Sequence, residues 1–183
     1  MERINKENKE KIMEMINKAG SEDYETSWID DKGKISVSKN KIEIKKGKIS
    51  RAQGARFELQ VRKDLENKGR VVDKWSNNVD LDEGKLIIAK RKYNPFKKIL
   101  VVGTGFPDFI SIKHIHDEMY SVIGVEVKMN GILSKIEKEK CGWYLKNKIF
   151  SHIWIAKKGE KRGQIIYDDF LEKYGKKFSQ FFD

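Results

Sequence analysis

The fold is indicated first by one apolar stretch, Ser121-Val122-Ile123-Gly124-Val125-Glu126-Val127-Lys128. A short apolar run of this kind is typical of a buried strand. Side chains two positions apart on a strand project from the same face, so Glu126 and Lys128 are expected to point the same way. Placing a charge near the core is costly, which favours a chemical purpose for Glu126. The stretch therefore predicts a strand that presents a carboxylate and an ammonium group together.

A second segment, Gly105-Phe106-Pro107-Asp108-Phe109-Ile110, precedes this strand. Its polar, glycine-rich beginning gives way to apolar residues after Asp108, which places that carboxylate at the mouth of another strand. If the two strands pair, two carboxylates and an ammonium group converge. Carboxylates bind Mg²⁺ or Mn²⁺, the metal activates water, and a lysine stabilises negative charge, so this set suits phosphodiester cleavage. The alternative is a turn carboxylate at Asp108 and an exposed charge pair at Glu126 and Lys128.

These segments resemble the motif of the PD-(D/E)XK nuclease superfamily, which reads here as Pro107-Asp108 followed by Glu126-Val127-Lys128. The wording of both segments, with the later Gly131-Ile132-Leu133-Ser134, is most similar to the VRR-NUC and archaeal Holliday junction resolvase-like branches. The resemblance covers residues 52–158. The chain departs from these relatives at Glu137, where they often carry glutamine.

The resemblance implies a fold and an activity. The expected fold is α/β: a restriction-endonuclease-like core with a central mixed β-sheet flanked by helices, plus a small N-terminal helix and β-strand extension. The expected activity is Mg²⁺-dependent endonuclease action on DNA, on branched, Holliday junction-like substrates in some relatives, with Mn²⁺ as a substitute metal and a homodimer as the assembly. The implied catalytic residues are Glu58, Asp108, Glu126 and Lys128, and the implied metal ligands are Glu58, Asp108, Glu126 and the carbonyl of Val127.

Glu58 enters this set because the resembling families place an acidic residue on the first core helix. A structural alternative is an ion pair between Glu58 and Arg62, which lie one helical turn apart. Two further classes of function stay open. One is a non-catalytic nucleic-acid-binding protein on a nuclease-like fold, and the other is an RNA-directed or restriction-type nuclease.

The composition favours a polyanion as the partner. The formal net charge is +11 and the isoelectric point is about 9.5, which is typical of nucleic-acid-binding proteins, although a lysine-rich surface also serves solubility. No apolar run reaches the roughly 18 residues that span a bilayer, and the first residues lack the apolar core of a signal peptide. We therefore expect a cytoplasmic protein that does not contact membranes. The single cysteine, Cys141, excludes an internal disulfide and is expected on the inner face of a helix.

Basic residues in two places are candidates for contact with nucleic acid. The segment from Lys90 to Lys98 interleaves cations with Tyr93 and Phe96, a composition that can bind phosphates and stack on bases; a solvated loop is the alternative. A second group opens the helix after the motif and could equally be a solvated face. The candidates are Lys90, Arg91, Lys92, Lys97, Lys98, Lys135 and Lys138.

The periodicity of the chain predicts two parts. Residues 1–50 form an extension with a helix over 2–19 and short strands between 26 and 45. Residues 51–183 form the nuclease-like domain. Its expected elements are helices over 51–68 and 133–147, strands over 70–75, 85–89, 108–110, 121–128, 151–156 and 164–167, a polar loop over 76–80, and a closing helix capped by Asp168.

Overall fold

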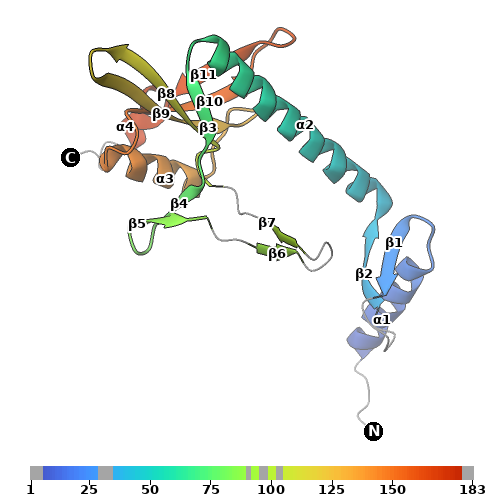
Figure 1. Ribbon diagram of the computed structural model, residues 1–183. Coiled ribbons are helices and arrows are strands. Elements are labelled where there is room, and N and C mark those ends of the chain that lie inside the picture. The colour runs from blue at the N-terminus through green and yellow to red at the C-terminus, as the bar shows by residue number, and fades with distance from the viewer. Residues whose placement is uncertain (1–5, 29–34, 90–91, 95–98, 102–104, 179–183) are drawn as a thin grey trace. The chain divides into compact units, whose positions relative to one another are not determined.

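The computed structural model describes residues 6–28, 35–89, 92–94, 99–101 and 105–178 (Figure 1). The chain forms two units, Met1–Ala55 and Arg56–Asp183. Glu58, Asp108, Glu126 and Lys128 all belong to the second unit. Within the described ranges, no helix combines the length and the apolar character needed to cross a membrane.

The first unit contains a helix and a hairpin, as the sequence predicts for this region. The helix is α1 (Lys6–Ala19), and the antiparallel hairpin consists of β1 (Tyr24–Trp28) and β2 (Ile35–Asn40). The unit ends with the first part of α2 (Lys41–Asn67). The apolar stripe of α1 is exposed at Ile12, Met15 and Ile16.

The expected strands between 26 and 45 extend too far, and the helix expected over 51–68 begins earlier, because α2 starts at Lys41 and includes Ile42 and Ile44. The side chain of Asn40 accepts a hydrogen bond from the backbone N–H of Ile42 at 2.9 Å, which satisfies one of the unpaired donors at the start of the helix. Ile42 is exposed, so its alternation with Ile44 does not reflect a buried strand face. Helix-favouring lysine and glutamate residues outweigh the short apolar alternation here.

The second unit is built on a five-stranded mixed sheet with the strand order β11-β10-β9-β8-β3. The strands are β3 (Val71–Lys74), β8 (Phe109–His116), β9 (Met119–Val127), β10 (His152–Lys158) and β11 (Ile165–Asp169). β9 and β10 run parallel, and the helix α3 (Lys135–Lys146) connects them; the other pairs are antiparallel. The prediction of an α/β fold with a central mixed sheet is confirmed.

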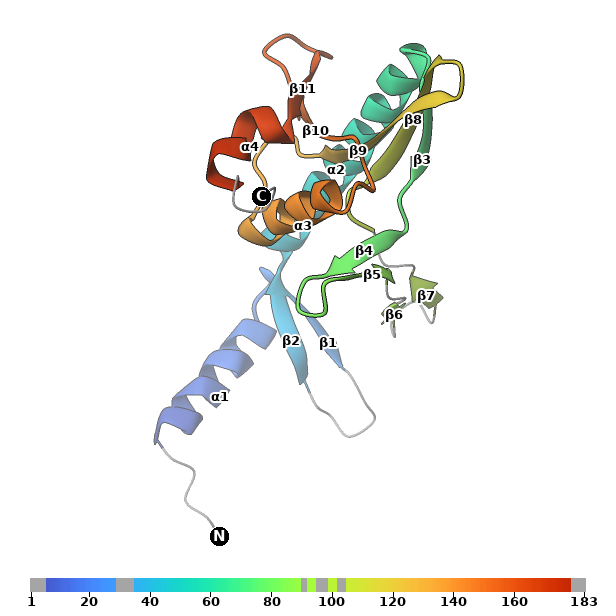
Figure 2. The same cartoon turned by 90° about the vertical axis from the view of Figure 1, so that its left-hand side faces the viewer.

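Helices pack on both faces of this sheet (Figures 1 and 2). The α2 residues Phe57, Val61 and Leu65 form one core cluster with Ile123 and Val125 of β9. The other face is covered by α3 and α4 (Phe170–Phe178), whose buried residues pack against Ile153 and Ile155 of β10. Cys141 is fully buried on α3, as predicted. Because Glu126 lies between Val125 and Val127 on β9, its side chain projects to the α3 face.

Two predictions in this unit are wrong in detail. The expected polar loop over 76–80 contains the strand β4 (Asn77–Asp80), which pairs with β5 (Lys85–Ile88). The apolar Val79 of β4 is buried in the core cluster that includes Cys141 and Tyr144 of α3, and this burial favours the strand. Asp169, not Asp168, caps α4: its carboxylate accepts from the backbone N–H of Leu171 at 2.8 Å. Asp168 instead forms ion pairs with Lys157 and Lys173.

A further small antiparallel pair consists of β6 (Lys92–Asn94) and β7 (Ile99–Val101).

Candidate active site

The pairing of β8 with β9 brings the two motif carboxylates together, as the sequence predicts. Asp108 lies immediately before β8, and its Oδ2 accepts a hydrogen bond from the backbone N–H of Val127 at 2.9 Å. The backbone N–H of Asp108 donates in turn to Oε2 of Glu126 at 3.2 Å. These reciprocal bonds fix both carboxylates at the end of the β8–β9 pair.

Two glycines permit this close approach. A Cβ atom on Gly105 would lie 2.0 Å from the carbonyl oxygen of Trp75, so only glycine fits where the chain enters the motif. A Cβ atom on Gly124 would lie 2.8 Å from Cγ of Pro107. The strand β9 therefore presents bare backbone to the proline that precedes Asp108, which sets how closely the two segments meet.

Lys128 lies on the same side of β9 as Glu126, as their spacing predicts. Its Nζ atom is 3.1 Å from Oε1 of Glu126 and 2.6 Å from Oε1 of Glu137, the third residue of α3. The ammonium group therefore bridges a strand carboxylate and a helix carboxylate. Since an ammonium group has three donors, one beyond these two described contacts can serve a water molecule or a phosphate oxygen.

Glu137 is held in place by the start of α3. Its Oε2 accepts from the backbone N–H of Ser134 at 2.7 Å, while Oγ of Ser134 accepts from the backbone N–H of Glu137 at 3.3 Å. This capping box satisfies two donors at the helix N-terminus and fixes the rotamer of Glu137. The carboxylate that contacts Lys128 is thus positioned independently of Lys128.

Burial dominates the electrostatics of the carboxylate pair. The side chain of Glu126 is 5 % exposed. Burial, followed by the charge of Asp108, raises the pKa of Glu126 to about 8, against the opposing effect of Lys128. Burial also raises the pKa of Asp108, and the charge of Glu58 adds to this shift. Without a cation the pair therefore retains a proton at neutral pH, and a bound cation would favour the fully ionised form.

The pKa shifts of Lys128 and Glu137, by contrast, favour the charged form of each side chain. Burial alone would lower the pKa of Lys128, but the hydrogen bond to Glu137 and the charge of Glu126 raise it. Burial would likewise raise the pKa of Glu137, but the hydrogen bonds from Lys128 and Ser134 lower it. Lys128 and Glu137 therefore form a charged pair at neutral pH.

Glu58 lies on α2, across the sheet from α3. Its Oε2 is 3.8 Å from Nζ of Lys74 on β3, and no ion pair with Arg62 is present among the described residues, because Arg62 binds Glu66 at 2.9 Å. The effect of Glu58 on the pKa of Asp108 places its carboxylate within electrostatic range of the motif. Its role as a metal ligand stays a prediction.

The oxygen atoms of the candidate site are of the kind that bind Mg²⁺, but only two carboxylates lie close together. Carboxylate oxygens are the ligands that Mg²⁺ takes in proteins, usually one or two of them with water and substrate phosphate completing the shell. Asp108 and Glu126 supply two such groups, next to the predicted carbonyl ligand of Val127. In the part of the chain that the structure describes, however, no three His, Cys, Asp or Glu side chains gather closely enough to hold a metal ion. Glu58 is therefore not part of a preformed group of three carboxylates.

The predicted nucleic-acid-binding residues fall into two groups. Lys90, Arg91, Lys97 and Lys98 lie outside the described residues, as does the side chain of Lys92 on β6. Lys135 is exposed at the start of α3. Lys138 lies with its ammonium group 4.6 Å from the ring centroid of Tyr174 on α4, so part of its side chain packs between two helices.

Comparison with protein families, with curated proteins and with solved structures finds no match to this chain. Its function is therefore inferred from its sequence and from the geometry of the site.

Glu137 is not among the site residues that the sequence motif implies, yet its carboxylate contacts the ammonium group of Lys128. The pattern Ser134-x-x-Glu137 is the signature of a capping box and predicts the rotamer of Glu137 at the helix start. Combined with the expected helix directly after the motif strand, that signature could have located Glu137 beside the strand end.

Proposed function

We propose that this chain is a divalent-metal-dependent endonuclease that hydrolyses phosphodiester bonds of DNA, on a restriction-endonuclease-like core. One observation carries the proposal: a buried carboxylate, Glu126, lies between a second carboxylate, Asp108, and an ammonium group, Lys128, at the end of a β-strand pair. The basic character of the chain, with a net charge of +11, favours a polyanionic substrate.

Asp108 and Glu126 would hold the metal, with the Val127 carbonyl and Glu58 as further ligands. Bound Mg²⁺ or Mn²⁺ supplies an activated water and stabilises charge on the phosphate. Lys128 would orient the attacking water by donating to it and would offset the negative charge that develops on the phosphate oxygens. Glu137 keeps that ammonium group charged and directed at the site. The water would attack in line with the bond that breaks.

The relatives that the motif resembles act as symmetric dimers on branched DNA. A homodimer that binds a four-way junction is therefore part of this proposal. The alternative function, a non-catalytic nucleic-acid-binding module, is favoured by the incomplete set of preformed carboxylates described above.

A cleavage assay separates the two functions. Purified protein is incubated with supercoiled plasmid, a four-way junction, a flap, a linear duplex and a single strand, each with Mg²⁺ or with EDTA. The proposal requires cleavage that EDTA abolishes and that Asp108→Asn removes without loss of DNA binding. Binding without cleavage of any of these substrates would favour the module.

A further inference from the structure

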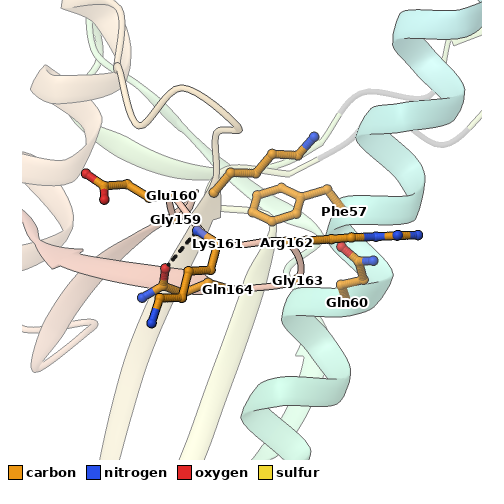
Figure 3. Close-up of a pocket in the computed structure, with 9 residues that line it drawn as sticks. Phe57, Gln60, Gly159, Glu160, Lys161, Arg162, Gly163 and Gln164 are labelled. Carbon is orange, nitrogen blue, oxygen red and sulfur yellow. Dashed lines mark hydrogen bonds between the residues drawn. The ribbon is translucent and has the colours of Figure 1, made fainter.

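We infer that a basic pocket beside the candidate active site binds a phosphate group of the nucleic-acid strand; this inference rests on the proposed function and names a second contact for its substrate. The pocket, called here the turn pocket, lies between α2 and the turn that joins β10 to β11 (Figure 3). Its volume is about 420 Å³. It is lined by Phe57, Gln60, Lys158, Gly159, Glu160, Lys161, Arg162, Gly163 and Gln164.

The charge of the turn pocket is positive. Lys158, Lys161 and Arg162 line it, against one acidic residue, Glu160. Figure 3 shows the Glu160 carboxylate directed away from α2, whereas Arg162 extends toward that helix. A guanidinium group binds phosphate oxygens through two parallel N–H donors, and the Gln60 amide adds donors of the kind that contact phosphate and sugar. The lining thus matches a compact anion with several acceptor oxygens.

The turn that presents these cations has a defined conformation. Oε1 of Gln164 accepts from the backbone N–H of Lys161 at 3.2 Å, and the backbone N–H of Gly159 donates to the carbonyl of Gln164 at 2.9 Å. The Gln164 side chain crosses the turn directly over Gly159, where a Cβ atom would lie 2.5 Å from Oε1. Gly163 has a φ of +82°, which closes the turn without strain. The braced turn therefore holds Arg162 over the pocket, whereas Figure 3 shows the Lys161 side chain directed away from α2.

The turn pocket lies on the α2 face of the sheet, where the Lys158 ammonium group is 5.8 Å from the ring centroid of Phe57, and two elements lead from it toward the candidate active site. On the sheet, the backbone N–H of Lys128 donates to the carbonyl of Ala156 at 2.9 Å, and Lys158 lies two residues further along β10. On the helix, Phe57 and Gln60 flank Glu58 in sequence. A bound nucleic-acid strand would therefore pass the end of the sheet, from a scissile phosphate at Asp108 and Glu126 to a neighbouring phosphate at the turn pocket on the α2 face.

The same chemistry has two sources, an internal phosphodiester and a terminal 5′-phosphate, and one binding experiment distinguishes them. Fluorescence anisotropy in EDTA, where cleavage cannot occur, measures the affinity of full-length protein for a duplex with and without 5′-phosphates over a range of salt. The test variant is Lys161→Ala/Arg162→Ala. The control is Lys113→Ala/Lys176→Ala, which removes the same charge from exposed positions on β8 and α4.

The turn pocket predicts that the test variant binds about tenfold more weakly than the control, with a salt slope lower by up to about 1.8, since each lost phosphate contact removes about 0.9. A loss on both duplexes assigns the pocket to an internal phosphodiester, and a loss only on the phosphorylated duplex assigns it to a strand end. Equal affinity of test and control variants on both duplexes would overturn the inference. Because this measurement contains no cleavage step, a wild-type protein that fails to cut DNA would refute the proposed function and leave the pocket result standing.

Discussion

Lys128 and Glu137 form the shortest polar contact of the candidate site, with 2.6 Å between Nζ and Oε1. Lys128 directly follows β9, and Glu137 is in the first turn of α3. The contact therefore joins the strand to the helix that follows it. The capping box holds the side chain of Glu137 through bonds to Ser134 that do not involve Lys128. The position of the ammonium group is therefore set by the start of α3.

Replacing Glu137 should impair turnover through Lys128. Glu137→Ala is expected to lower kcat by about 10- to 100-fold, because a displaced catalytic group costs up to about 10²-fold, and to cost about 1 kcal/mol of stability through the lost cap. Glu137→Gln keeps the capping geometry and a contact oxygen, so it should recover most of kcat. A Glu137→Ala enzyme with parental kcat would show that this contact is only structural, and no recovery with Gln would show that the geometry of the contact is not sufficient without its charge.

Lys128 itself should affect chemistry and not metal affinity. Lys128→Met keeps the apolar stem of the side chain and removes the charge that faces Glu126 and Glu137. Removing one stabilising group of this kind costs about 10²- to 10³-fold in rate. Single-turnover cleavage measures that loss, and isothermal titration with Mn²⁺ should show unchanged binding. A loss below about threefold would exclude Lys128 from the reaction.

The carboxylates should be needed for metal binding. Asp108→Asn and Glu126→Gln preserve side-chain volume and remove the charges, so each is expected to abolish both Mn²⁺ binding and cleavage while retaining DNA affinity. Glu118→Gln, on the exposed β8–β9 turn, is the matched control and should behave as the parent. Parental cleavage rates in both motif variants would refute the assignment of the site.

The raised pKa of Glu126 predicts how stability depends on pH when metal is removed. The folded protein holds this proton up to about pH 8, whereas the unfolded chain loses it near the ordinary value of 4.5. Between these values the folded state binds more protons, so stability should fall as pH rises, by at most about 1.4 kcal/mol per pH unit. Urea unfolding in EDTA at pH 5.5, 6.5 and 7.5 measures this slope, and Glu126→Gln should flatten it. Parallel pH profiles for both proteins would contradict the prediction.

The sequence predicted the motif strands because their signals are local. The alternation around Glu126 and the Gly-Phe-Pro-Asp entry depend on residues that are adjacent in the chain, and the pairing of β8 with β9 follows from the short connection between them. The start of α2 is not predicted, because Ile42 and Ile44 alternate as in a strand, and only the exposure of Ile42 shows that this alternation buries no sheet face.

The contact between Glu137 and Lys128 cannot be predicted from local sequence patterns, for a different reason. The capping box is readable in the sequence, but the contact with Lys128 depends on how α3 returns across the sheet to β10. The turn pocket likewise combines α2 with a turn about a hundred residues later in the chain. Such contacts depend on tertiary packing, which periodicity does not encode.

Gly124 should control the position of Asp108 from the neighbouring strand. A Cβ atom in Gly124→Ala would lie 2.8 Å from Cγ of Pro107 and 3.1 Å from the buried ring of Phe150, so Pro107 must move and carry Asp108 away from the N–H of Val127. We expect a loss of about 1–3 kcal/mol in stability from overpacking and a lower Mn²⁺ affinity. Gly54→Ala is the control, because nothing lies within 4 Å of its added Cβ atom and alanine favours the helix by about 1 kcal/mol. Urea unfolding and isothermal titration measure both effects; a Gly124→Ala protein with parental Mn²⁺ affinity would show that Asp108 is positioned independently of this contact.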